Sequence, residues 1–238
     1  MTRALVLLAL TVLIGGCLPS GRHFVRPTPT TFQLGQSSVE DVKRLLGDPS
    51  DQRAWARNDD VLRDPPTPLP TLFGPAPVNG AMRELSYRYL WRLGEAAARG
   101  VEPSKRLSLW FWNDRLVGYR SSSSFKEDST DFDESKVAEI TQWKSQRDDV
   151  VKLLGPPSGV AGYPLTRHED QQILIYQASE WDTSENQIRT KSLYVLVNAL
   201  GLVEDARFDG SSRSLPPPVV TPGVTTVPIY VPPPRRGR

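Results

Sequence analysis

Few side chains in this 238-residue chain are of the types that carry nucleophilic or metal chemistry. It has one cysteine, Cys17, and two histidines, His23 and His168. These three residues cannot fill a four-coordinate structural zinc site, and one thiol cannot form an intramolecular disulfide. Neither histidine stands in a catalytic motif, and the sequence has no Gly-x-Ser-x-Gly turn and no Gly-rich phosphate loop. We therefore expect a protein that is not an enzyme, with no catalytic residue, no metal ion and no bound cofactor.

The position of Cys17 nevertheless predicts one covalent role for it. An apolar run over residues 4–14 follows Arg3, and it is too short for a membrane-spanning helix but typical of a secretory signal. The run ends in five residues that resemble the lipobox of bacterial lipoproteins: Leu13, Ile14, Gly15, Gly16 and Cys17. The resemblance implies a signal peptide over residues 1–16 and a lipid on Cys17. The alternative is an ordinary secretory signal, which would leave the protein free in the periplasm.

A lipid on Cys17 would hold the chain on a membrane leaflet without a membrane span. Leu18 stands where an Asp commonly retains such proteins at the inner membrane, so the resemblance implies the periplasmic leaflet of the outer membrane. Residues 17–31 are expected to form the lipidated stalk. The chain has 29 basic and 27 acidic residues, for a net charge of +2, which argues against a nucleic-acid partner.

A repeat is the most informative pattern in the chain. Residues 35–50 align with residues 143–158, with identical residues at eight of the 16 positions. Each copy reads as a capped helix, with capping boxes predicted for Ser37 with Glu40 and for Ser145 with Asp148. Gly47 and Gly155 are predicted to end these helices. The apolar spacing predicts one buried stripe on each helix, composed of Val42, Leu45 and Leu46 and of Val150, Leu153 and Leu154.

Strand patterns follow each predicted helix. Alternating residues predict strands at 84–91, 106–112 and 116–119 in the first copy, and at 172–177, 193–197 and 202–203 in the second. A short helix is expected before the second capped helix, within 135–143. We therefore predict one domain over 32–125 with a Pro-rich insertion at 64–80, a linker at 126–134, and a second domain over 135–212. A Pro-rich, basic and disordered tail is expected over 213–238.

The segment from Phe32 to Pro49, with the lipobox upstream, resembles the SmpA/OmlA or BamE-like family, which is related in fold to beta-lactamase inhibitory protein. The resemblance implies an α+β fold of two tandem modules, each a short helical pair packed on a small antiparallel sheet. It also implies a non-enzymatic, lipid-anchored scaffold that supports outer-membrane protein assembly or envelope integrity. Its partners would be the membrane and outer-membrane or periplasmic proteins, with the beta-barrel assembly machinery as the candidate. The alternative is an inhibitor or regulator of a periplasmic hydrolase.

Aromatic residues are the candidate contacts for such partners. Trp110 and Trp112 share one face of a predicted strand, and Tyr87 lies on the preceding strand. Two interpretations of the Trp pair stay open: it lies on an open sheet face as an interaction patch, or it is covered by the other copy, the insertion or the tail. The basic tail offers a further contact, to peptidoglycan.

Overall fold

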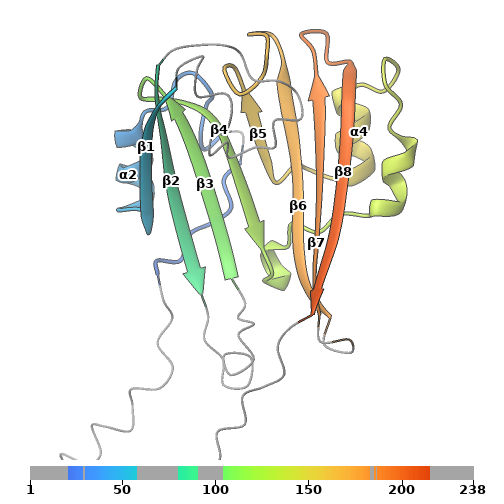
Figure 1. The fold of residues 1–238 in the computed structure, drawn as a ribbon, viewed down its shortest axis with the longest axis horizontal. Coiled ribbons are helices and arrows are strands. Elements are labelled where there is room, and N and C mark those ends of the chain that lie inside the picture. Colours follow the sequence, from blue (N-terminus) through green and yellow to red (C-terminus); the bar gives the residue numbers. More distant parts are fainter. Residues whose placement is uncertain are drawn as a thin grey trace, which may run out of the picture.

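The computed structural model describes residues 21–28, 30–57, 80–90, 104–182, 185 and 187–214. Eight strands form one antiparallel sheet in chain order (Figure 1). They are β1 (Asp51–Arg57), β2 (Gly80–Leu90), β3 (Ser104–Trp112), β4 (Arg115–Ser123), β5 (Gly159–Gly162), β6 (Gln172–Asp182), β7 (Gln187–Val197) and β8 (Val203–Ser214). The helices are α2 (Val39–Leu46), α4 (Arg147–Leu154) and the short 3-10 helices η4 (Lys126–Asp128) and η5 (Glu134–Glu139).

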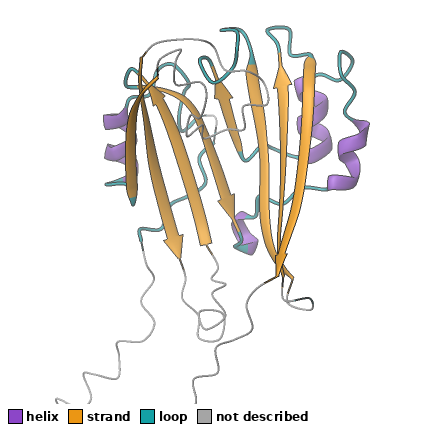
Figure 2. Ribbon diagram, in the orientation of Figure 1, coloured by secondary structure: helices purple, strands orange, loops and turns teal. Residues whose placement is uncertain are grey.

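The predicted fold class is wrong. The chain does not form two α+β modules, each with a helical pair on its own small sheet; the described residues form one β-rich, eight-stranded sheet with short helices (Figure 2). The two halves merge because β4 pairs with β5, with Gly118 opposite Ala161 and Arg120 opposite Gly159. Glycine permits this approach, since a Cβ on Gly159 would clash with the carbonyl oxygen of Tyr119.

Both α-helices begin one residue later than predicted. Ser38 caps α2: its hydroxyl accepts from the Asp41 N–H at 3.2 Å, and its own N–H donates to the Asp41 carboxylate at 3.0 Å. In the second copy the N–H of Gln146 donates to Asp149 at 2.9 Å. The Ser37–Glu40 and Ser145–Asp148 boxes are therefore wrong. Ser37 and Ser145 instead accept from N–H groups of the preceding turn, which belong to Gln33 and Thr141.

Gly47 and Gly155 end the helices, as predicted. Their φ angles of 81° and 82° with ψ near 180° belong to a region that is essentially open to glycine alone. Each glycine carbonyl then accepts a hydrogen bond from a buried tyrosine hydroxyl on the sheet: Tyr87 donates to Gly47 and Tyr176 to Gly155, both at 3.0 Å. The same contact thus docks each helix end onto its half of the sheet.

The two faces of the sheet carry separate apolar clusters. The cluster on the helix side joins Val42 of α2 and Val150 of α4 to strand residues from both halves. Leu45 is wrongly predicted as buried: it is 54% exposed, because the apolar contact of α2 runs through Val39 and Val42. On the other face, residues from both halves again pack together, including Met82, Trp110 and Ile173.

Two lysines hold the segment that connects the halves. Lys105 on β3 is 4% exposed, and its Nζ lies 2.7 Å from Asp128 and 5.3 Å from the ring centre of Phe125. Lys191 occupies the equivalent place on β7. Lys105 stands two residues before Leu107, the strand partner of Tyr87. Lys191 likewise stands two residues before Leu193, the strand partner of Tyr176.

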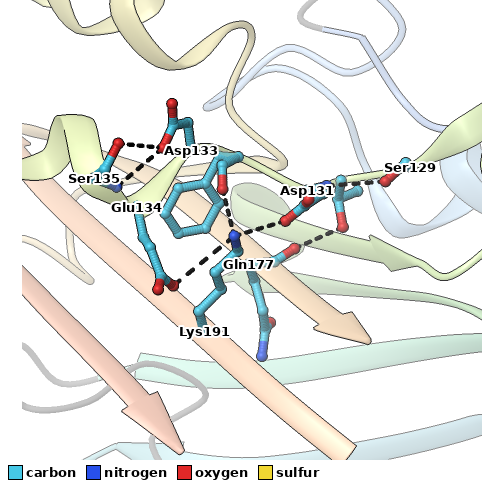
Figure 3. Close-up of polar contacts among 9 residues, drawn as sticks. Ser129, Asp131, Asp133, Glu134, Ser135, Gln177 and Lys191 are labelled. Atoms are coloured by element: carbon cyan, nitrogen blue, oxygen red, sulfur yellow. Dashed lines mark hydrogen bonds and ion pairs between the residues drawn. The ribbon is translucent and has the colours of Figure 1, made fainter. Parts of the chain in front are cut away.

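The ammonium group of Lys191 is surrounded by groups of the same connecting segment (Figure 3). It lies 2.8 Å from the Asp131 carboxylate and 3.9 Å from that of Glu134, and it donates to the Phe132 carbonyl. It also lies 4.9 Å from the centre of the Phe132 ring. Residues 126–134, predicted as a linker, are therefore bound to both halves of the sheet.

We predict that Asp128→Asn lowers the free energy of unfolding by about 3 kcal/mol, because it leaves the buried charge of Lys105 without its anion. Asp131→Asn is the matched control. It should cost only about 1 kcal/mol, since Lys191 is more exposed and keeps Glu134 and the Phe132 carbonyl. Urea unfolding of both variants measures the difference, and equal losses would contradict the role of burial.

The buried Tyr87 hydroxyl predicts a loss of stability at alkaline pH. Burial, with a smaller effect of the nearby Asp48 charge, raises the pKa of Tyr87 to about 12. In the unfolded chain, tyrosine ionises near its usual pKa of 10.0. The contribution of the buried Tyr87 to the free energy of unfolding is therefore fully present below pH 10. It is lost as the pH rises from 10 towards 12, by about 1.4 kcal/mol per pH unit. Tyr87→Phe should lose about 1 kcal/mol at pH 8 through its missing hydrogen bond, and this deficit should shrink above pH 10. Urea titrations from pH 8 to 11.5 test this; a constant deficit would contradict it.

Candidate protein interaction surface

Of the three predicted contact residues, the structure buries Trp110 and Tyr87 and leaves Trp112 half-buried. Trp110 is fully buried on the helix-free face, among residues of both halves of the sheet. Tyr87 is buried on the opposite face, where its hydroxyl binds Gly47. Trp110 and Tyr87 are therefore not exposed to a partner protein. Trp110 is covered by residues of the second copy, and Tyr87 is covered by the helix end of its own copy.

Trp112, the last residue of β3, is half-buried. Its ring meets that of Tyr163, from the β5–β6 loop, edge to face at 5.8 Å. Its indole nitrogen packs directly on Gly80, where a Cβ would clash with it. The indole N–H groups of Trp110 and Trp112 are buried without a hydrogen-bond partner within the described residues. Other residues, including some of the second copy, thus cover most of the surface of the Trp pair.

Three arginines gather on the helix-free face of the sheet. Arg88, Arg106 and Arg120 lie on the neighbouring strands β2, β3 and β4, and we call them the arginine cluster. Arg88 and Arg106 are direct cross-strand partners, and Arg120 is diagonal to Arg106, because their pairing partners are Ser108 and Ser122. Alternation fixes the face, since Tyr87, Tyr89, Leu107 and Tyr119 pack on the helix side.

The arginine cluster concentrates positive charge on one face of the sheet. Among the described residues, no carboxylate forms an ion pair with any of its three guanidinium groups. Partial burial, together with repulsion from Arg88, lowers the pKa of Arg106 below its usual value. Like charges directly opposite each other in a sheet are unfavourable for folding. An anionic group placed over the cluster would relieve this repulsion.

A tryptophan fixes one member of the arginine cluster. The guanidinium of Arg120 lies 5.7 Å from the centre of the Trp110 ring, at a distance typical of a cation–π contact. A guanidinium group also carries N–H donors that match a carboxylate in a two-point hydrogen bond. The buried Trp110 therefore acts as a support for Arg120 rather than as a contact of its own.

The arginine cluster could not be predicted from the individual strand patterns. The strand patterns at 84–91, 106–112 and 116–119 place each arginine on the polar side of a strand, but the alignment of one strand with the next decides whether they meet. Another aromatic residue on the surface is Trp143, which the repeat alignment places at the position of Gly35 in the first copy. It is 58% exposed and has a φ of 60°, a conformation that bulky residues rarely adopt.

The remaining predicted site residues lie outside the described residues. They are Cys17 and the lipobox residues Leu13, Ile14, Gly15 and Gly16. The predicted Pro-rich insertion at 64–80, apart from Gly80, also lies outside the described residues. Of the tail predicted over 213–238, residues 213 and 214 belong to β8 and the rest lies outside. Over the described ranges, no three His, Cys, Asp or Glu side chains gather as a metal site would require. No helix in the same ranges has the length and apolar character needed to cross a bilayer.

We predict that Arg88→Gln leaves the fold intact and raises the free energy of unfolding by about 0.2–1 kcal/mol at low salt, because it removes the repulsion with Arg106. Arg83→Gln is the control on the same strand. Arg83 lies on the other face, 3.6 Å from Asp114, so its loss should not stabilise the protein. Urea unfolding at 20 mM and 500 mM salt should show the Arg88→Gln gain shrinking with salt. A loss of stability in Arg88→Gln at low salt would refute the repulsion.

No family model matches the sequence, and no curated protein matches it. Among solved structures, the chain is similar to a "putative beta-lactamase inhibitor protein" from Streptococcus mutans. The likeness covers 78% of this chain and 89% of that one, with 13% sequence identity and a TM-score of 0.38. It is a distant structural likeness, which gives this chain neither a family nor a function.

Proposed function

We propose that this protein is a non-enzymatic binding module that takes an acidic surface of another protein on the helix-free face of its sheet. The arginine cluster is the observation that carries the proposal. Three guanidinium groups on adjacent strands, one of them held over Trp110, present donors suited to carboxylates. Arginine is also among the residue types that contribute most to the energetics of protein interfaces.

The folding energetics support a binding role for the arginine cluster. Side chains that serve the fold alone would place an acidic residue opposite Arg88 or Arg106, whereas the sheet places two arginines opposite each other. Unfavourable arrangements of this kind are common where function competes with stability. A partner's carboxylates would supply the missing opposite charge.

The lipid anchor on Cys17 is the second part of the proposal. The sequence at residues 13–17 supports acylation, which would hold the binding module on the periplasmic leaflet of the outer membrane. Anchoring raises the effective concentration of the module near other membrane-bound proteins. The protein would then act as a scaffold in envelope assembly or maintenance, without a bound cofactor or a catalytic step.

Crosslinking in intact cells, followed by mass spectrometry of the captured proteins, tests this function. We expect the triple variant Arg88→Ala, Arg106→Ala and Arg120→Ala to lose at least about tenfold in partner capture. The matched control removes the same number of positive charges at exposed positions elsewhere: Arg44→Ala, Arg83→Ala and Lys136→Ala. It should capture partners as the wild type does. Equal capture by both triple variants would refute the arginine cluster as the binding surface.

A Cys17→Ser variant separates the anchor from the binding surface. Envelope-assembly proteins captured only when Cys17 is present would support the anchored scaffold. Capture of one soluble hydrolase without regard to Cys17, with loss of its activity on binding, would instead favour the inhibitor. Either result leaves the arginine variants as the test of the surface itself.

A further inference from the structure

The two halves of the sheet repeat each other contact by contact. In the first half, the Gly35 N–H donates to the Leu116 carbonyl at 2.7 Å, and the Leu116 N–H donates to the Ser37 carbonyl at 2.8 Å. In the second half, Trp143, Val203 and Ser145 make the same pair of bonds at 2.7 and 2.9 Å. Leu116, the second residue of β4, is therefore equivalent to Val203, the first residue of β8.

A second set of contacts relates β1 to β5. The Ser50 hydroxyl accepts from the N–H of Arg88 at 3.1 Å, and the Ser158 hydroxyl accepts from that of Gln177 at 2.9 Å. Since Ser50 directly precedes β1 and Ser158 directly precedes β5, Asp51 corresponds to Gly159. The register of β4 also shifts by one residue against β3, as that of β8 does against β7, so the residues of β4 after this shift correspond to those of β8.

These equivalences turn the inner junction into a template for the two outer edges. Within the chain, Gly118–Arg120 of β4 pairs with Gly159–Ala161 of β5. The corresponding residues are 205–207 on β8 and 51–53 on β1, which are the two edges of the eight-stranded sheet. Both strands run in the directions that an antiparallel junction between them requires, because all neighbouring strands alternate.

We propose that β8 of one molecule pairs with β1 of a second copy of this chain, in the register of the inner junction. That register places Asp205 opposite Arg53 and Arg207 opposite Asp51, with Ala206 opposite Gln52 between them. Opposite charges thus meet at both ends of the pairing, and such cross-strand pairs favour a sheet. This inference goes beyond the proposed binding function and does not depend on it.

The edge residues are positioned for such an exchange. On β1, the side chains of Asp51 and Arg53 are 52% and 67% exposed and form an ion pair at 3.1 Å. On β8, those of Asp205 and Arg207 are 35% and 47% exposed and form one at 3.0 Å. Each ion pair joins residues two apart on one strand, so both charges stand on the same face. When two copies associate, the two ion pairs within strands are replaced by two ion pairs across strands. Each of these four side chains then still has an oppositely charged partner.

The proposed outer junction, between β8 of one copy and β1 of the next, differs from the inner junction in how closely the two backbones approach. The inner junction depends on Gly118 and Gly159, whereas the outer edges carry Asp205 and Asp51 at these places. The outer edges therefore meet at ordinary strand spacing, with charge pairs in place of the close backbone contact. Because β8 of one copy meets β1 of the next, the contact is head to tail, and each assembly keeps one free edge of each kind.

Sedimentation velocity of the full chain carrying Cys17→Ser, which keeps it free of lipid, tests the proposal. We expect the average mass to rise above the monomer's 26.5 kDa with concentration, between about 5 and 500 μM, and to pass the dimer without a plateau. Arg53→Asp or Asp205→Arg alone should raise the concentration needed for association by about tenfold or more. Mixing these two variants should restore association, because each junction then again joins opposite charges.

Arg213→Asp is the matched control, since it makes the same charge change on β8 outside the pairing register. Thermal unfolding of each variant checks that the monomer still folds. A chain that stays monomeric at every concentration overturns the proposal, and so does a closed dimer that is insensitive to Arg53→Asp. Binding of an extended peptide at these edges without self-association would also overturn it.

Discussion

The pairing of β4 with β5 is the contact on which the architecture depends. It involves three residues on each strand, Gly118–Arg120 and Gly159–Ala161, yet it joins two four-stranded halves into one sheet. Once the halves are joined, both apolar clusters span the junction, so each half buries surface that it would otherwise expose to water. The glycines at this junction have a steric purpose: they let two backbones approach where side chains would keep them apart.

The arginine cluster illustrates how a stable scaffold carries an unfavourable surface. The helix side of the sheet is filled by buried tyrosines, leucines and valines that supply the folding free energy. The helix-free face can then tolerate Arg88 opposite Arg106, whose repulsion is small against the burial on the other side. The arginines of the proposed binding surface and the residues that stabilise the fold thus alternate along the same strands.

The sequence predicted those features that are determined locally. The helix ends at Gly47 and Gly155 follow from a backbone conformation that glycine adopts, and the repeated sequence pattern located both helices. The capping boxes were misplaced by one residue because Ser37 and Ser38 are both suitable caps, and only the preceding turn decides between them. The strand alternation also correctly separated the two faces of β2 and β3.

Features that depend on contacts between strands could not be predicted in the same way. The sequence of β5, Gly-Val-Ala-Gly, has no strand pattern, and its assignment rests on the neighbours it joins. Without β5 the two copies read as separate modules, and the single sheet was missed. The burial of Trp110 and the meeting of the three arginines likewise depend on the register between strands, which the sequence of a single strand does not determine.

The connecting segment contains a natural division of the chain. Phe125 and Asp128 serve Lys105 in the first half, while Asp131 and Phe132 serve Lys191 in the second. A break in the backbone at Ser129 would therefore leave each lysine with its own anion and ring. The two fragments would have to recombine through the β4–β5 junction to bury their shared apolar residues. The connecting segment thus consists of one part that completes the first half and one part that completes the second, with Ser129 between them.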